Sequence, residues 1–460
     1  MTSDRAWIAL IIAWAMVQVA WRFAQGPALE LDEAEAFYFA LDFALGYNAQ
    51  PPLYFWLQWL VFAVVGQGIL GLALLKYALL GTAGLLLYAM LRRLRPPFEA
   101  GVAVMGLGLL PQVLWEAQRA LTHSVLALTM ALLVMALADR VLRGPGRAGL
   151  GAWAALGIAA GLGAISKWNV ALLPLAILLA ACLRAEWRAR IDPRGVMLAV
   201  VVAAAVVALP FWWVFRNPVV AGGSLHKLGI DEAAPLWRML VGLGSLASAW
   251  IAFCGLVIVV GGLIAFKLRG QARWRPDPQS RLMLVTMGAG AGLLAVGVVL
   301  SGVTDVADRW LLPIAVFSAP VFVLWALDSL GPLGGRWLAR GLGALWVTGF
   351  ALLPVSGWVE PGYRAADFAG LAKWIEDRHS DVAVVSDSIW IAGNLALVLP
   401  DRPVWRSVDA PELTGAVLWV ARQGTAQALA ATRGKTAAPA GGHPLRRGSR
   451  REAVDLAFSP

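Results

Sequence analysis

The sequence predicts an α-helical polytopic membrane protein of about eleven transmembrane helices, followed by a small C-terminal α/β region. Of the 460 residues, 60% are hydrophobic and 14% are charged, and the mean hydropathy is +0.70. Apolar runs of about 18 residues or more, the length that crosses a bilayer as a helix, recur from Ala6 to Leu353. A soluble protein of this length carries more charge on its surface, so the composition excludes a soluble globular fold.

The expected spans follow the apolar runs in chain order. The first run, Ala6 to Phe23, is long, rich in tryptophan and without a small-residue cleavage site, so we expect a retained helix and not a signal peptide. The turn at Ser166 and Lys167 divides one apolar stretch into a helical hairpin. The approximate bounds of the spans are 6–24, 69–91, 99–116, 121–139, 149–165, 169–184, 195–215, 238–266, 282–301, 310–328 and 337–355.

Arginine and lysine gather in alternate loops between these spans. The positive-inside rule places the basic loops and the N-terminus in the cytoplasm, and an odd number of spans places the region from about Trp358 outside. Because the net charge of +10 is concentrated in these clusters, it argues against nucleic-acid binding. The basic loops contain Arg92, Arg93 and Arg95; Arg140, Arg143 and Arg147; Arg184, Arg188, Arg190 and Arg194; Lys267, Arg269, Arg273, Arg275 and Arg281; and Arg336 and Arg340.

The stretch from Pro51 to Gly66 is apolar but short. It begins with two prolines and carries Trp56 and Trp59, which favours a helix at the membrane interface, where indole rings settle among the headgroups. The alternative is an ordinary span, which would invert the rest of the topology and break the alternation of the basic loops.

Composition divides the chain into three regions. Residues 1–356 form the expected transmembrane domain, in which 25–68 is the first outer loop. Residues 357–424 combine helical periodicity with a β-branched strand at Val382 to Val385, which predicts a small outer α/β domain. Residues 425–460 are dominated by Ala, Gly, Pro and Arg, which predicts a disordered tail.

The first outer loop gathers acidic residues in a chain that otherwise has few. Ionisable groups close to a bilayer are costly and are often functional. Either Asp32 or Glu33, facing a cavity below the interface, is a candidate general base for an acceptor hydroxyl. The alternative is that these are solvated loop acids that reinforce the topology. The acidic residues are Glu30, Asp32, Glu33, Glu35 and Asp42.

The predicted outer face carries few basic residues, and those few are candidates for binding an anion. Lysine and arginine neutralise phosphate through charge-assisted hydrogen bonds. Each of them is alternatively an interfacial anchor or a partner of Asp305 or Asp308. The basic set is Lys167, Arg216, His226, Lys227 and Arg309. His123, at the outer start of a span, is either a site residue or a hydrogen-bonded helix-start histidine.

Several common sites have no signature in the sequence. There is no CxxC pair, no phosphate-binding glycine loop, no nucleophile elbow and no metal-ligand spacing. The outer-loop carboxylates leave a divalent metal ion possible without requiring one. Cys182 and Cys254 lie in apolar runs and are interpreted as small core residues.

The first outer loop resembles that of the GT-C membrane glycosyltransferases. The resemblance is to the dolichyl-phosphate-mannose protein mannosyltransferases and bacterial relatives such as the lipid A aminoarabinose transferase. It rests on the acidic pair Asp32-Glu33, the following Gly46-Tyr47, and Pro51-Pro52 at the start of an aromatic helix. It covers roughly residues 6–420.

Three further features agree with this resemblance. The glycine-rich turn that ends in Ser166-Lys167 resembles the family's Ser/Thr-Lys turn, and Arg309-Trp310-Leu-Leu-Pro313 resembles its late Arg-Tyr-x-x-Pro helix start. A small outer α/β domain also closes many bacterial members.

The resemblance implies a GT-C helical bundle in a bacterial inner membrane and an inverting transfer of a sugar from a polyprenyl-phosphate donor. The acceptor would be an envelope molecule at the periplasmic face: lipid A, a glycan, a lipid or a protein. Asp32 would be the catalytic base and Glu33 its motif partner. Lys167, Arg309 and Gln50 would bind the donor phosphate, and Tyr47, His123 and Arg216 the substrate.

The sequence departs from the family pattern at two positions. Many bacterial relatives have lysine where this chain has Gln50, and aspartate where it has His123. Gln50 can donate a hydrogen bond but brings no charge, so the phosphate would depend more on Lys167 or Arg309.

Two other functions compete with the transferase. A transporter or flippase of lipid-linked or amphipathic substrates requires mid-helix charges or broken helices in paired repeats. The predicted helices are nearly free of mid-span charge and no repeat is evident, which counts against this function. A non-catalytic membrane scaffold that presents the C-terminal domain predicts that Asp32 and Lys167 can be changed without consequence.

Overall fold

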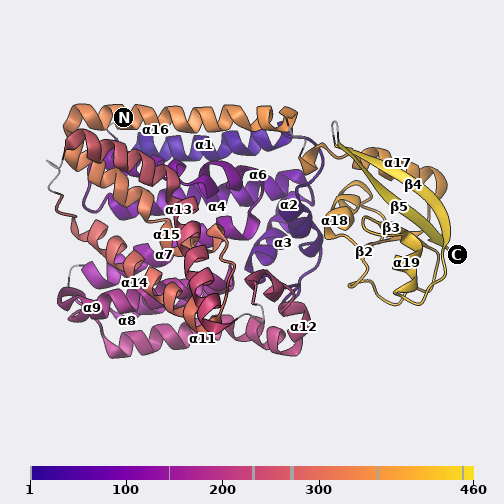
Figure 1. Ribbon diagram of the computed structural model, residues 1–460, viewed down its shortest axis with the longest axis horizontal. Coiled ribbons are helices and arrows are strands. Elements are labelled where there is room, and N and C mark those ends of the chain that lie inside the picture. Colours follow the sequence, from indigo (N-terminus) through magenta and orange to yellow (C-terminus); the bar gives the residue numbers. More distant parts are fainter. Residues whose placement is uncertain (1–2, 145, 231–233, 270–273, 360–361, 448–449) are drawn as a thin grey trace. The chain divides into compact units, whose positions relative to one another are not determined.

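The computed structural model describes residues 3–144, 146–230, 234–269, 274–359, 362–447 and 450–460 (Figure 1). The chain folds into two compact units. The first, called here the helical unit, comprises Met1–Met16, Ala44–Tyr54 and Lys76–Phe350. The second, the mixed unit, comprises Val17–Phe43, Phe55–Leu75 and Ala351–Pro460.

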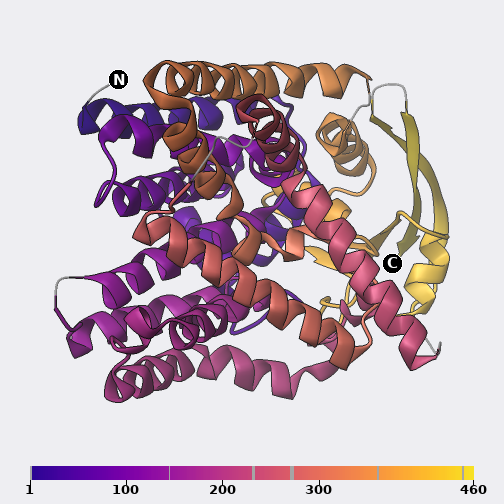
Figure 2. The ribbon, with the colours of Figure 1, turned by 60° about the vertical axis from the view of Figure 1, so that its left-hand side comes forward.

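Most described residues are helical, and seven helices are long and apolar enough to cross a membrane (Figures 1 and 2). An eighth span results if the bent pair Pro97–Leu109 and Gln112–Arg119, with 84° between its parts, is one crossing. This confirms the predicted fold class. The seven helices are α1 (Asp4–Ala24), α4 (Ile69–Leu91), α7 (Thr122–Arg143), α11 (Pro193–Arg216), α13 (Pro235–Leu268), α14 (Pro278–Ser301) and a long helix over Leu312–Leu353.

The number of membrane crossings stays a prediction, because three of the expected segments differ from an ordinary full-length span. The predicted hairpin is α8 (Leu150–Ala164) with Trp168–Leu183, both shorter than the other spans. The last two spans lie in one element, α16 (Ser318–Val359), which Gly331 interrupts with a φ of 66°. α3 (Leu53–Val65) has 13 residues, short of the roughly 20 that cross a bilayer.

Small residues allow close helix packing within the helical unit. α8 and α11 run side by side (Figure 1). A Cβ on Gly157 would lie 2.4 Å from the carbonyl oxygen of Ala199, and one on Gly161 would lie 2.7 Å from Cβ of Val206. The glycines of these apolar runs therefore bring helix backbones together, as expected where no hydrophobic effect drives helices to associate.

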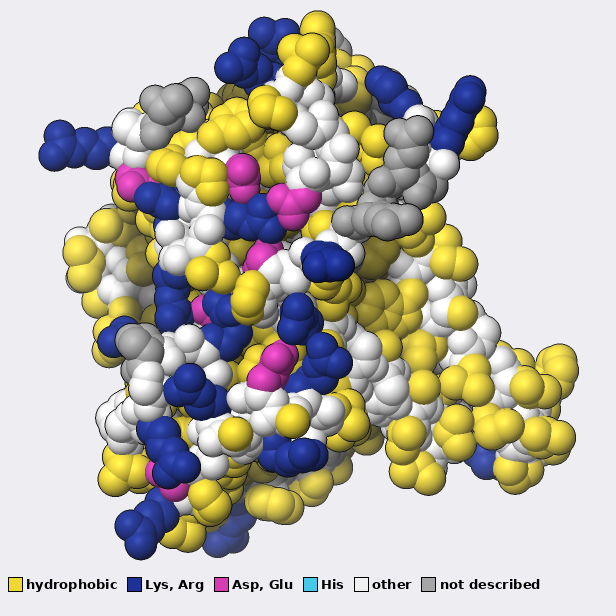
Figure 3. Space-filling model, turned by 90° about the vertical axis from the view of Figure 1, so that its left-hand side faces the viewer, with side chains coloured by type: hydrophobic (Ala, Val, Ile, Leu, Met, Phe, Trp, Pro, Cys, Tyr) yellow, Lys and Arg dark blue, Asp and Glu magenta, His cyan; other side chains and the backbone are white. Residues whose placement is uncertain are grey.

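Ion pairs join described residues of the basic loops predicted to face the cytoplasm, at an end of the helical unit where Figure 3 shows many Lys and Arg side chains. Here arginines are neutralised by acids: Arg95 lies 2.6 Å from both Asp277 and Asp328. Asp277 also caps α14, accepting from the backbone N–H of Ser280 at 3.0 Å. Burial would raise the pKa of Asp277, but the hydrogen bonds from Arg95 and Ser280 outweigh it and hold that pKa below its ordinary value.

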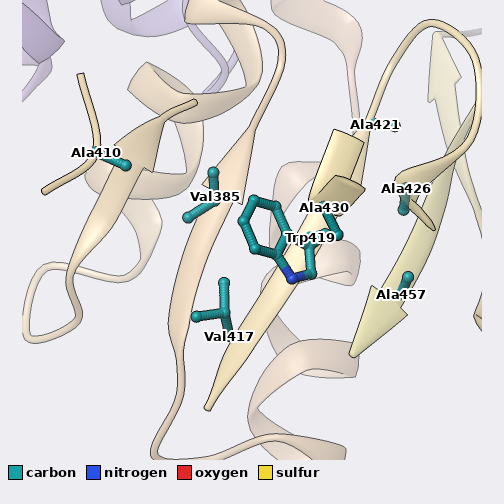
Figure 4. Packing of buried hydrophobic residues seen from close by; sticks show 8 residues of the cluster. All are labelled: Val385, Ala410, Val417, Trp419, Ala421, Ala426, Ala430 and Ala457. Carbon is teal, nitrogen blue, oxygen red and sulfur yellow. The ribbon is translucent and has the colours of Figure 1, made fainter. Parts of the chain in front are cut away.

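The mixed unit contains a five-stranded sheet in the order β2-β1-β3-β5-β4. The parallel strands are β1 (Ala383–Ser386), β2 (Val404–Arg406) and β3 (Val417–Ala421), and the antiparallel hairpin is β4 (Ala438–Arg447) with β5 (Arg450–Ser459). Figure 4 shows Trp419 of β3 packed among Val385, Val417 and Ala457. The helices of this region are α17 (Phe368–Arg378), α18 (Ile389–Val398) and α19 (Ala426–Ala431).

The structure differs from the disordered tail expected over 425–460, because α19 and the β4–β5 hairpin lie there. β5 pairs with β3, with Ala457 opposite Trp419, and its Val454 and Leu456 are buried. Ser459 Oγ accepts a hydrogen bond from Trp419 Nε1 at 2.6 Å. Backbone pairing with β3 therefore orders a segment whose composition alone predicts disorder.

Candidate functional site

The acidic motif lies in the mixed unit, on helix α2 (Leu31–Phe39). Glu33 closes a capping box, because its Oε2 accepts the backbone N–H of Glu30 at 3.1 Å. Its carboxylate also receives Arg22 Nε at 2.9 Å and Arg364 Nη2 at 2.6 Å. All three charged side chains are buried: 3% of Glu33, 1% of Arg22 and 8% of Arg364 is exposed.

This buried cluster indicates that Glu33 holds the start of helix α2 in place. Both of its oxygens accept hydrogen bonds from guanidinium groups, so the carboxylate oxygens are engaged by two cations. A group in that state is a poor base for a substrate hydroxyl. Asp32, the preceding residue on the same helix, is half-buried and is the better candidate.

Helix α2 and the residue Leu29 before it are fixed by contacts with α18. These contacts join distant parts of the chain, since 365 residues separate Leu29 from Asn394. The backbone N–H of Leu29 donates to Asn394 Oδ1 at 2.7 Å, and its carbonyl accepts from Trp390 Nε1 at 2.8 Å. A Cβ on Gly393 would lie 2.3 Å from the carbonyl oxygen of Ala34, so only glycine allows this approach. The mixed unit therefore holds the acidic motif with its own C-terminal part.

Tyr38, near the end of α2, is also tied to the sheet. Its hydroxyl accepts the backbone N–H of Arg406 at 2.9 Å. Burial raises the pKa of Tyr38 to about 12, so this side chain stays protonated at neutral pH.

The turn that carries Lys167 lies in the helical unit, against the Pro-Pro segment. The backbone N–H of Leu53 donates to the carbonyl of Ile165 at 3.1 Å, and Trp168 Nε1 donates to the carbonyl of Ala49 at 3.0 Å. Gln50 lies between these two attachments, so the structure brings it to the Lys167 turn.

His123 and Ser124, at the start of α7, lie beside the same turn. Lys167 Nζ donates to Ser124 Oγ at 2.8 Å. The His123 ring packs on the Tyr54 ring with 5.4 Å between centroids, and only 6% of the residue is exposed. Because His123 is buried, the structure favours a role in packing beside the Lys167 turn over contact with a substrate.

The Arg309 turn is attached to the Lys167 turn. Asn169, two residues after Lys167, donates from Nδ2 to the carbonyl of Trp310 at 2.7 Å. The Arg309 side chain is exposed.

Asp308, which the sequence offers as an ion-pair partner of Arg309, is satisfied by neutral donors. Its carboxylate accepts the backbone N–H of Arg309 at 2.7 Å and the side-chain amide of Gln112. Among the described residues no acid forms an ion pair with the Arg309 guanidinium.

The end of α11 completes this region of the helical unit. A Cβ on Gly46 would lie 2.3 Å from the Trp213 ring, which places the Tyr47 loop on α11. The Tyr47 hydroxyl accepts the backbone N–H of Ala44 at 2.9 Å. Arg216 is exposed and lies 5.6 Å from the centroid of the Trp212 ring.

The structure thus joins the segments that carry Gln50, His123, Lys167 and Arg309 by hydrogen bonds and ring contacts. It places the Tyr47 loop on α11, the end of which carries Arg216. His226 and Lys227 lie in η4 (Leu225–Leu228), whose Leu228 carbonyl accepts from Thr304 in the loop before Arg309. No group of three metal-ligating side chains is found within the described ranges.

Gln112, which the sequence gives no reason to single out, contacts Asp308 beside the Arg309 turn. It begins a π-helical turn, Gln112–Glu116, and Leu121 shortly after it has a φ of 62°. π-helical turns and left-handed residues other than glycine are frequent at functional sites, but neither leaves a signal in the sequence.

Comparisons with known proteins identify the family and the fold. The model of the dolichyl-phosphate-mannose-protein mannosyltransferase family matches residues 49–213. The lipopolysaccharide core galacturonosyltransferase RgtB of Rhizobium johnstonii is 32% identical over 455 residues, which cover 93% of this chain and 89% of RgtB. The chain belongs to the GT-C membrane glycosyltransferases. RgtA of the same organism is also named a lipopolysaccharide core galacturonosyltransferase. It is 32% identical over 413 residues, which cover 86% of this chain and 81% of RgtA.

Solved structures show that this glycosyltransferase has the GT-C fold. ArnT from Cupriavidus metallidurans, bound to undecaprenyl phosphate, has a TM-score of 0.61 at 16% identity and covers 98% of both chains. The mycobacterial arabinofuranosyltransferase AftD has a TM-score of 0.53 at 16% identity, over 99% of this chain and 42% of AftD. The family segment 49–213 contains Gln50, His123 and Lys167, so three candidates of the helical unit lie inside it.

Proposed function

We propose that this glycosyltransferase moves a uronic-acid sugar from a polyprenyl-phosphate donor to the core saccharide of lipopolysaccharide. The observation that carries the proposal is the 32% identity to RgtB over 93% of the chain. The similarity to a fold that binds undecaprenyl phosphate in ArnT agrees with a lipid-phosphate donor. The reaction takes place at the periplasmic face of a bacterial inner membrane, with the N-terminus in the cytoplasm, as the alternation of the basic loops predicts.

The chemical step is an inverting substitution at the anomeric carbon. The acceptor hydroxyl oxygen forms the new bond to that carbon, and the bond between the carbon and the phosphate oxygen breaks. Asp32 takes the hydroxyl proton, and the leaving group departs as polyprenyl phosphate. The donor already carries the leaving group, so no nucleotide is bound during the transfer.

We assign binding of the donor phosphate to the cations of the helical unit. As the glycosidic bond breaks, negative charge grows on the phosphate and must be stabilised where it develops. Lys167 and Arg309 supply positive charge, and the Gln50 amide supplies a neutral donor in place of the lysine of other family members. The hydrogen bonds around the Lys167 turn support this assignment, because they bring the three segments together.

The proposal is tested with purified wild-type protein and the Asp32→Asn variant. Sugar transfer is measured from radiolabelled polyprenyl-phosphate galacturonate, with the arabinose and mannose analogues for comparison, to purified lipopolysaccharide core. We expect turnover with the uronate donor that Asp32→Asn reduces by about a thousandfold or more, because general-base catalysis and acceptor orientation are lost together.

Each contrary result removes a different part of the proposal. Equal turnover by the two proteins would remove Asp32 from the mechanism. Turnover only with a neutral sugar donor would exclude the uronate. A wild-type protein that transfers none of the three sugars while retaining its fold would contradict the transferase itself.

A further inference from the structure

We infer that Trp168 and Asn169 are positioning residues for donor binding. They lie in η3 (Trp168–Ala171), a short turn in the helical unit. The turn joins three chain segments, each of which carries one of the expected phosphate ligands. The inference rests on the proposed function, because it assigns a part to residues around the proposed phosphate site.

The geometry of the attachments is the first argument. Trp168 Nε1 donates to the carbonyl of Ala49 at 3.0 Å, and Asn169 Nδ2 donates to the carbonyl of Trp310 at 2.7 Å. Both are direct side-chain bonds to backbone carbonyls of segments more than a hundred residues away, 119 and 141 respectively. Two neighbouring side chains therefore fix two distant loops.

The position of each attachment is the second argument. Ala49 precedes Gln50, Trp310 follows Arg309, and Trp168 itself follows Lys167. Both accepting carbonyls thus belong to residues next to an expected ligand, and the two donor side chains lie one and two residues after Lys167. The expected ligands lie in turns, not within long helices, so the hydrogen bonds of η3 determine their spacing.

Physical chemistry connects that spacing to affinity. Charge-assisted hydrogen bonds to phosphate require donor–acceptor distances of about 2.7–2.9 Å, so a displaced ligand loses most of its contribution. A displacement of about 1 Å is enough to weaken a site by a large factor. Loss of one attachment should therefore weaken binding of the phosphate while leaving the affinity for the acceptor unchanged.

A matched control separates positioning from general stability. Gln279, at the end of the helical unit with the basic loops, also donates its side-chain amide to a distant backbone carbonyl, that of Met90 at 2.6 Å. It is buried and lies in none of the proposed ligand segments. Gln279→Leu therefore removes the same kind of bond, together with a longer one to Asp139 Oδ2 at 3.3 Å, without touching the proposed site.

The experiment compares Asn169→Leu, Asn169→Asp and Trp168→Phe with Gln279→Leu. Trp168→Phe removes the N–H but keeps a ring against Phe211, whose centroid is 5.5 Å from that of Trp168. Binding of undecaprenyl phosphate to the detergent-solubilised full chain is measured first, then donor KM, acceptor KM and kcat, with the thermal midpoint of each variant. We expect the Trp168 and Asn169 variants to bind undecaprenyl phosphate and donor about tenfold more weakly, with kcat changed less than about threefold and acceptor KM unchanged.

The outcomes distinguish this inference from the proposed function. Gln279→Leu is expected to lower the thermal midpoint and leave donor KM unchanged. Trp168 and Asn169 variants that behave in the same way would overturn the positioning role, while wild-type turnover would leave the proposed function standing. A wild-type protein that neither binds undecaprenyl phosphate nor transfers sugar would overturn both. Because Trp168→Phe is conservative, it tests the inference even if the Asn169 variants do not fold.

Discussion

The two units hold the charges of the candidate site in opposite ways. In the mixed unit, Glu33 lies between two buried arginines, and its charge is matched by charges of the same chain. In the helical unit, the Arg309 turn is held by a side-chain amide on the carbonyl of Trp310, and the Arg309 side chain is exposed. A buried charge that is matched within the protein contributes to the fold, whereas an exposed charge on a fixed backbone is available to an anionic ligand.

The largest effect is expected where matched charges are buried. Glu33→Gln leaves Arg22 and Arg364 buried without their counter-charge, which costs about 3–5 kcal/mol of folding free energy. We expect the thermal unfolding midpoint of the mixed unit to fall and proteolysis of its C-terminal part to accelerate.

Asp409→Asn is the matched control for Glu33→Gln. It changes the carboxylate that pairs with Arg406 at 2.7 Å, a pair whose side chains are 21% and 29% exposed. Partly exposed pairs contribute about 0–1 kcal/mol, so this variant should unfold close to wild type. Equal thermal midpoints for the two variants would mean that the buried Glu33 cluster contributes no more to stability than the partly exposed pair.

A smaller effect, confined to the donor, is expected at the exposed charge. Arg309→Gln should raise donor KM by about tenfold or more, because a charge-assisted hydrogen bond contributes about 1.5–3 kcal/mol. The thermal midpoint should change little, since no described acid pairs with this guanidinium. Arg340→Gln at the opposite end, where the guanidinium lies 4.8 Å from the Trp337 ring centroid, is the control. If Arg309→Gln lowered stability and left donor KM unchanged, the contrast between the units would be wrong.

The sequence predicts the features that depend on local composition. The helical spans follow from hydropathy, and the Ser166-Lys167 turn follows from a polar pair between two apolar runs. The candidates around that turn could be named because acids and bases are rare in such a chain. These are properties of short segments, so no tertiary information is needed.

Other features depend on contacts between distant segments. Arg22 and Arg364 could not be assigned to Glu33, because nothing in the sequence indicates that residues 331 apart, Glu33 and Arg364, meet in one cluster. Gln112 lies in a π-helical turn that has no composition signal. The β4–β5 hairpin is ordered by pairing with β3, which a composition dominated by alanine, glycine and arginine does not show.

The smallest expected effect concerns two histidines of the mixed unit. Burial lowers the pKa of His379, and nearby Arg378 and Arg402 lower it further. Burial also lowers the pKa of His443, against the opposing effect of Asp367. The His379 ring stacks on Phe458 of β5, with 4.9 Å between centroids.

The sign of the pH dependence follows from these directions. Both histidines are more readily protonated in the unfolded chain, whose pKa is near 6.5, than in the folded one. Below that pH the unfolded state binds more protons, so the stability present above pH 6.5 is lost as the pH falls. We expect the unfolding midpoint of the mixed unit to decrease between pH 7.5 and 5, and the decrease to shrink in the His379→Gln, His443→Gln double variant. If the double variant kept the full decrease, the acid sensitivity would belong to groups other than these two histidines, and the assignment would be wrong.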